Sequence, residues 1–223
     1  MPNHSVEPVV LIVLLGLFAL APFVLIMLTS FVKISVVLSI LRNALGTQQI
    51  PPTQVITGIS LILTFFIMAP VAERMYAEAN IQDANPLASG TSINSLMDAF
   101  KRGREPLRVF LVKHSNKHDQ MLFNDLAREM ARRNGNDPEA VGGTDFRVII
   151  PSFVTSQLTE AFKIGFLLFL PFLVIDMVVA NILQAMGMFM LSPMMISLPF
   201  KLLLFVLIDG WVLLIQGLVL SYN

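Results

Sequence analysis

The sequence predicts an all-α integral membrane-type protein of two long helical hairpins, with four long, kinked apolar helices and a small helical insert between the hairpins. Three observations predict this class. The 223 residues are 55% hydrophobic and 13% charged, with a mean hydropathy of +0.74, whereas about a quarter of a soluble domain is charged. Apolar runs long enough to cross a bilayer come in two pairs. Between the pairs lie 11 of the 15 basic and 11 of the 15 acidic residues.

The first hairpin is expected to comprise residues 1–71. Its first apolar run extends from Val9 to Leu41, longer than the roughly 20 residues that a membrane helix needs, and Pro22 favours a kink in it. No Lys or Arg precedes Val9, so we expect a retained helix rather than a cleaved signal peptide. A polar connection from Arg42 to Pro52 leads into the second run, Thr53 to Val71.

The insert, residues 72–147, predicts short amphipathic helices with no net charge. Apolar residues recur at helical spacing in three segments: Ile93, Leu96, Met97 and Phe100, then Leu107, Phe110 and Leu111 after Pro106, then Leu122, Phe123, Leu126 and Met130. Asp119 is expected to cap the third helix. The stretch 134–144 is rich in Gly, Asn and Asp and predicts a loop.

The second hairpin, residues 148–223, joins the run Ser152–Leu183, which contains Pro171, to the run Leu198–Leu220. Their connection has no charge, although a loop between membrane helices is normally polar. Its apolar centre consists of Met186, Gly187, Met188, Phe189 and Met190. Flexible thioethers adapt to irregular contacts, so this segment predicts a soft constriction or an oligomer contact.

Gly and Pro residues are similarly spaced in the two hairpin connections. Ala44-Leu-Gly46 followed by Pro52 matches the spacing of Ala185-Met-Gly187 followed by Pro193. The match fits an internal repeat, and it also fits coincidence in Gly and Pro placement. Four crossings would put both termini and the insert on one side. Arg42 lies in a short connection, which favours a cytoplasmic location for the connections and a periplasmic one for the insert.

Ionisable residues interrupt or border the apolar runs: Lys33, Arg42, Glu160, Lys163, Asp176, Lys201 and Asp209. Such charges need partners on other helices or a wet cavity. They fit either a proton or ion relay or structural pairing within an assembly, and we favour pairing because buried charges are paired by default. Asp176 with Lys201 is the expected pair across the second hairpin.

Several chemistries are not expected. His114 and His118 have the spacing of a zinc pair on a helix, but Ser115 stands where zinc proteases have Glu, and no third ligand is clear. The chain has no cysteine, phosphate-binding loop or nucleophile elbow. We therefore expect no metal, no cofactor and no enzyme activity. The zero net charge gives no reason to expect nucleic-acid binding.

Three blocks carry a resemblance to a known family: Thr29 to Pro52, Ile149 to Phe166, and Leu170 to Trp211 with Met186-Gly-Met-Phe-Met190 inside it. Together they resemble the R subunit of the type III secretion export apparatus, whose flagellar relative is FliP. The short chain without a basic signal peptide is more similar to the virulence branch. Two positions depart from the usual pattern, Phe189 where relatives often have Met and Gln157 where they often have Glu.

The resemblance implies an export gate in the bacterial inner membrane. Several copies of the chain, forming a pentamer, would assemble with the S and T subunits and contact the U and V subunits, and unfolded secreted proteins would pass through. The Met-rich loop would form a gasket around the channel. Two alternatives stay open, a proton-coupled or small-solute transporter and a membrane scaffold without a pore.

Overall fold

The computed structural model describes residues 15–16, 19–20, 22–23, 26–47, 50–79 and 93–222, with the backbone alone for 93–97. Over these residues it is helical and contains no strand, which confirms the all-α class. The elements are α2 (Phe31–Leu45), α3 (Thr53–Ala79), α4 (Ile93–Gly103), α5 (Glu105–Lys113), α6 (Lys117–Arg133), the 3-10 turn η1 (Pro138–Ala140), α7 (Phe146–Ala185), α8 (Pro193–Leu207) and α9 (Gly210–Leu220).

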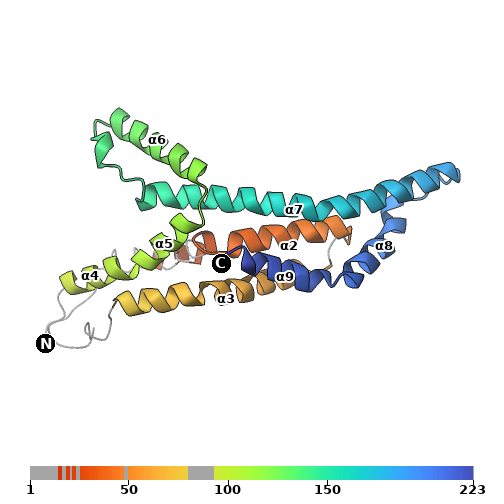
Figure 1. The fold of residues 1–223 in the computed structure, drawn as a ribbon, viewed down its shortest axis with the longest axis horizontal. Coiled ribbons are helices and arrows are strands. Elements are labelled where there is room, and N and C mark those ends of the chain that lie inside the picture. The colour runs from red at the N-terminus through yellow and green to blue at the C-terminus, as the bar shows by residue number, and fades with distance from the viewer. Residues whose placement is uncertain are drawn as a thin grey trace.

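The 40-residue helix α7 is about 60 Å long and runs along most of the molecule, with α2 beside it and α3 beyond α2 (Figure 1). Small residues let α2 and α7 approach closely, because Ala161 is fully buried and Gly165 lies against the side chain of Ile40. A Cβ atom at Gly165 would overlap Ile40 and would lie 3.1 Å from its Cβ. The first core therefore forms around α2, whose Ile34, Val37 and Leu41 are inaccessible to solvent.

Helix α6 projects away from this bundle, whereas α5 packs with α7 and α3 in a second core (Figure 1). Phe110 and Leu111 of α5 pack there against Ile149 and Phe153 of α7, together with Tyr222 near the C-terminus.

The prediction that Asp119 caps α6 was wrong. Asn116 caps the helix by accepting a hydrogen bond from the His118 N–H, at 3.0 Å.

Asp119 lies in the first turn of α6 instead, where its carboxylate accepts a 2.6 Å hydrogen bond from Ser156 of α7. The predicted apolar face of α6 is mostly uncovered, since Leu122, Leu126 and Met130 are exposed and Phe123 is half-buried. Helix α6 is thus attached to α7 by polar contacts at its start rather than by that face.

Two described helices, α3 and α7, are long and apolar enough to cross a membrane, and the pair α8 and α9 makes a third candidate if it is counted as one bent span. Residues 9–14, 17–18, 21 and 24–25 of the run predicted from Val9 to Leu41 lie outside the described residues. Within it, helical residues at 26–27 are followed by a turn at Leu28–Ser30 before α2 begins, so the helical run is interrupted at 28–30.

The last apolar run is not one helix. It begins at Pro193, earlier than predicted, and bends by 61° between α8 and α9. At the break Asp209 has a left-handed backbone with φ of 51°, and Gly210 lies directly under the ring of Phe205. The Trp211 ring meets Phe205 edge-on at 5.5 Å. A side chain at Gly210 would overlap that ring, so glycine is what permits this bend.

The two hairpin connections share a backbone conformation where each one begins. α2 is followed by Gly46 with φ of 75°, and α7 is followed, one residue later, by Gly187 with φ of 71°. Left-handed residues at helix ends are a common device that satisfies the last carbonyls, and glycine adopts them without strain. The spacing match in the sequence therefore corresponds to a shared backbone conformation at the two glycines.

Replacing Gly165 with alanine is expected to force α2 and α7 apart and to lower stability by about 1–3 kcal/mol. Gly58→Ala is the matched control, because no atom lies within 4 Å of its added Cβ and alanine favours helix by about 0.5–1 kcal/mol. Thermal unfolding in mild detergent compares the two. Equal melting temperatures for Gly165→Ala and the wild type would show that the close approach is not needed.

Candidate functional site

The Met-rich turn is the uncharged segment from Met186 to Ser192 between α7 and α8, shorter than the sequence suggested. It lies at the far end of the long helix α7 (Figure 1). The turn is formed by backbone hydrogen bonds, the Gly187 N–H donating to the Gln184 carbonyl at 3.0 Å and the Met188 N–H to the Leu183 carbonyl at 2.9 Å. The left-handed Gly187 reverses the chain at the end of the helix.

The apolar side chains of this turn are uncovered. Met188 is 43% exposed, Phe189 80% and Met190 100%, and Met186 is exposed as well. Apolar side chains grouped on a monomer surface mark a binding surface, a membrane contact or an interface between subunits. Their thioethers and the single phenyl ring suit a contact surface that changes shape.

A buried charged cluster lies at the base of the turn. Lys201 of α8 is almost completely buried, and its ammonium donates to the carboxylate of Asp176 on α7 at 2.6 Å. Ser197, one turn before Lys201, donates its hydroxyl proton to the other oxygen of the same carboxylate. The ion pair predicted across the second hairpin is therefore present, and it joins α7 to α8 at the base of the Met-rich turn.

The same ammonium also reaches α2. Lys201 donates to the carbonyl oxygen of Ala44 at 3.2 Å, and a Cβ at Gly46 would lie 3.8 Å from the Lys201 nitrogen. A cation at the C-terminal end of a helix stabilises its free carbonyls and its dipole. One buried lysine thus connects α7, α8 and the end of α2, and so ties the Met-rich turn to both hairpins.

A second charged cluster lies at the other end of α2. Lys33, nearly fully buried, forms a 2.7 Å ion pair with Glu160 of α7, and its ammonium lies 4.6 Å from the ring centroid of Tyr222. The Tyr222 hydroxyl donates to the side-chain carbonyl of Gln157, whose amide nitrogen donates to the His114 carbonyl at 2.8 Å. α2, α5, α7 and the C-terminal end therefore meet in one connected network.

His114 takes part in this network through its ring as well as its backbone. The imidazole lies 4.6 Å from the Phe110 ring and 5.0 Å from the Tyr222 ring. Burial, together with the nearby Lys113 and Lys33, lowers the His114 pKa to about 4. The ring is consequently neutral near pH 7. His114 directly follows the last residue of α5 and His118 lies in the first turn of α6, so the two are not on one helix as the zinc spacing assumed.

The remaining predicted charges are not in these clusters. Arg42, half-buried, donates to the Thr53 hydroxyl at 3.0 Å across the first connection. Lys163 on α7 and Asp209 at the break before α9 are exposed, and neither has an ion-pair partner among the described residues. No group of His, Asp and Glu in the described part of the chain has the arrangement of a metal site.

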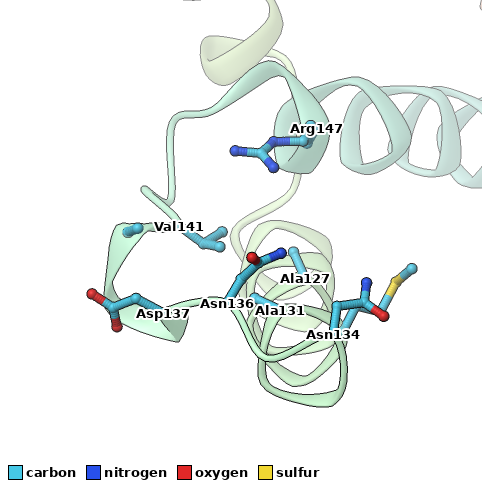
Figure 2. Close-up of a pocket in the computed structure, with 9 residues that line it drawn as sticks. Ala127, Ala131, Asn134, Asn136, Asp137, Val141 and Arg147 are labelled. Carbon is cyan, nitrogen blue, oxygen red and sulfur yellow. The ribbon is translucent and has the colours of Figure 1, made fainter.

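A surface cleft in the insert contains none of the residues of these two clusters. It has a volume of about 570 Å³, lies between α6, η1 and the start of α7, and combines Ala127, Ala131 and Val141 with polar Asn136 and Arg147 (Figure 2). Arg147 approaches Asp145 only at 3.8 Å. The cleft lacks a set of groups suited to acid–base or nucleophilic chemistry.

Sequence reasoning missed several members of the two clusters. Ser197 and Tyr222 were not singled out, because a lone hydroxyl carries no signal of a partner 21 or 65 residues away. Gln157 was singled out only because related proteins often have Glu at this position. In the structure its amide both donates and accepts, which a carboxylate cannot do.

Comparison with known proteins gives one consistent result. The FliP family model matches residues 14–218. The Yop proteins translocation protein R of Yersinia pestis is 47% identical over 213 residues, 96% of this chain and 95% of the relative. The flagellar biosynthetic protein FliP of Bacillus subtilis is 43% identical over 221 residues (99% and 95%), and the hypersensitivity response secretion protein HrcR of Ralstonia nicotianae 43% over 225 (99% and 100%). Virulence-type and flagellar relatives thus match to a similar degree.

Lys201→Met is expected to lower stability by about 3–5 kcal/mol. The substitution leaves Asp176 without its cation and removes the hydrogen-bond donor to the Ala44 carbonyl at the end of α2. The double variant Asp176→Leu/Lys201→Met removes both charges, so it should lose less stability than Lys201→Met alone. Lys117→Met, at an exposed lysine of α6, is the control. The stability of all three variants is measured by denaturation in detergent. A Lys201→Met protein as stable as the control would show that the cluster does not hold the helices together.

Proposed function

The chain belongs to the FliP family, and from this premise we propose that it is an export-gate subunit whose Met-rich turn seals an entrance pore for unfolded proteins. Membership makes it a non-enzymatic, inner-membrane component of a type III export apparatus. The virulence branch is supported by the relatives named translocation protein R and HrcR, while the flagellar relatives are similarly close.

The observation that carries the proposal is the bare apolar turn at the end of a long helical hairpin. Met188, Phe189 and Met190 contact little of their own chain, yet the clusters at Lys201 hold the base of the turn in place. An apolar constriction of this kind seals by excluding water, and therefore ions, when the side chains meet. Because methionine side chains are flexible, they can part for a polypeptide and close behind it.

A single turn cannot surround a channel, so the proposed pore needs several copies. We propose a pentamer of the chain, completed by the S and T subunits and in contact with the U and V subunits. The units would be the first hairpin (1–71), a periplasmic insert (72–147) and the second hairpin (148–223), in a multi-pass arrangement with the hairpin connections toward the cytoplasm. The candidate spans α3, α7 and the bent pair α8 and α9 flank the short helices α4 to α6, which supports this division.

The structure gives less support to a proton-coupled or small-solute transporter. Asp176 is held by the ammonium of Lys201 and the hydroxyl of Ser197, so both of its carboxylate oxygens are already used in joining α7 to α8. Asp209 has no second acidic residue nearby in the sequence with which to form a relay. Both acids fit roles in packing and assembly better.

Replacing Met188, Phe189 and Met190 together with alanine is expected to raise ion conductance several-fold or more while the complex still assembles, because smaller side chains leave a hydrated gap in the seal. The matched control is Met121→Ala with Met130→Ala, which removes two exposed thioethers from α6. Conductance is measured in reconstituted bilayers, and assembly by native mass. Wild-type conductance from an intact complex would rule out the seal.

A further inference from the structure

The cleft in the insert is a concave site that neither the Met-rich turn nor the two charged clusters use. Its volume of about 570 Å³ is within the range of pockets that hold small ligands, roughly 300–1,000 Å³. Its walls come from three separate elements, the end of α6, the η1 turn and the start of α7 (Figure 2). A ligand in this cleft would contact all three elements at once, which favours a single bound orientation.

Arg147 supplies the cleft with a cation that is only loosely paired. Its guanidinium extends from the first turn of α7 over the cleft (Figure 2). The ion pair that it forms with Asp145 spans 3.8 Å, beyond the length of a hydrogen bond, and the same carboxylate already accepts from the Gly142 N–H at 3.2 Å. The parallel N–H groups of an arginine match the two oxygens of a carboxylate. The cleft therefore offers this fork of donors to an anionic group.

Asn136 supplies the second polar group of the cleft. Its backbone N–H donates to the Ala131 carbonyl at 2.9 Å, which holds the residue against the end of α6. Figure 2 shows its amide beside Ala127, below the Arg147 side chain. An asparagine amide both donates and accepts hydrogen bonds, as a peptide group does. The residue is thus placed to pair with a peptide group next to the anion that Arg147 would bind.

The apolar part of the cleft is built from small side chains. Ala127 and Ala131, one turn apart on α6, line it together with Ala140 and Val141. Short side chains leave space that longer ones would fill, and their methyl groups favour contact with other small apolar groups. Four such residues cannot cover the acyl chain of a lipid. The cleft fits a ligand with one negative charge, a peptide group and a small apolar side chain.

We propose that this cleft binds the C-terminal carboxylate of a peptide whose last residues are small and apolar. Arg147 holds the carboxylate through both of its oxygens, and Asn136 pairs with the peptide group before it. Capture of a chain end by such groups is a recurring mode of peptide recognition. A phosphate fits less well, because the carboxylates of Asp137 and Asp145 near the arginine repel a second negative charge. The site does not depend on the Met-rich turn or on a pore.

Fluorescence anisotropy of a labelled peptide tests the site directly. The probe is fluorescein-Gly-Ala-Ala with a free C-terminal carboxylate, titrated with the full chain in a mild uncharged detergent. We expect saturable binding, and binding about tenfold or more weaker when the C-terminus is amidated, because amidation removes the charge that the arginine recognises. Excess unlabelled Gly-Ala-Ala should displace the probe, whereas inorganic phosphate at the same concentration should not. No binding, equal binding of the acid and amide forms, or displacement by phosphate would overturn the proposal.

Substitutions locate the binding in the cleft. Arg147→Gln is expected to weaken binding of the acid peptide about tenfold or more and to leave binding of the amide unchanged. Ala131→Leu keeps both polar groups but fills the apolar part, so it should weaken binding of both peptides. Arg132→Gln is the matched control, since this exposed arginine of α6 does not line the cleft. Melting temperatures show that each variant is folded. A folded Arg147→Gln protein that binds the acid peptide as well as the control does would refute the site.

Discussion

The ammonium group of Lys201 is the interaction on which the arrangement around the Met-rich turn depends. It is buried, and it is shared between the Asp176 carboxylate of α7 and the Ala44 carbonyl near the end of α2, with Ser197 donating to the carboxylate. A buried cation is tolerated only where several oxygen atoms surround it. These oxygens come from separate helices, so the cost of burying one charge fixes the relative position of α2, α7 and α8.

The network around Lys33 does the same at the opposite end of α2. There the Lys33–Glu160 pair, the Tyr222 hydroxyl and the Gln157 amide connect α2 and α7 to the insert and to the C-terminal end. Between the two networks α2 packs through apolar side chains and the small surface at Gly165. Apolar packing alone allows helices to slide, whereas two polar anchors determine their register. The exposed turn is consequently held on a rigid base.

The sequence predicted what depends on composition and periodicity. The helical class, the positions of the apolar runs, the insert helices and the pairing of Asp176 with Lys201 follow from spacing along the chain. The missed features depend on tertiary contacts. Asn116 rather than Asp119 caps α6 because Asp119 is used by Ser156, and the break before α9 arises because Phe205 packs on Gly210. Neither contact leaves a mark in the local sequence pattern.

The central claim is that the buried cluster at Lys201 aims the Met-rich turn at a lumen shared by several copies. A density map of the complex extracted in mild detergent tests it most directly. We predict that Met188, Phe189 and Met190 of every copy converge on a narrow central axis, with the Lys201–Asp176 pair intact behind them. Side chains directed into lipid or bulk solvent, away from any such axis, would contradict the account.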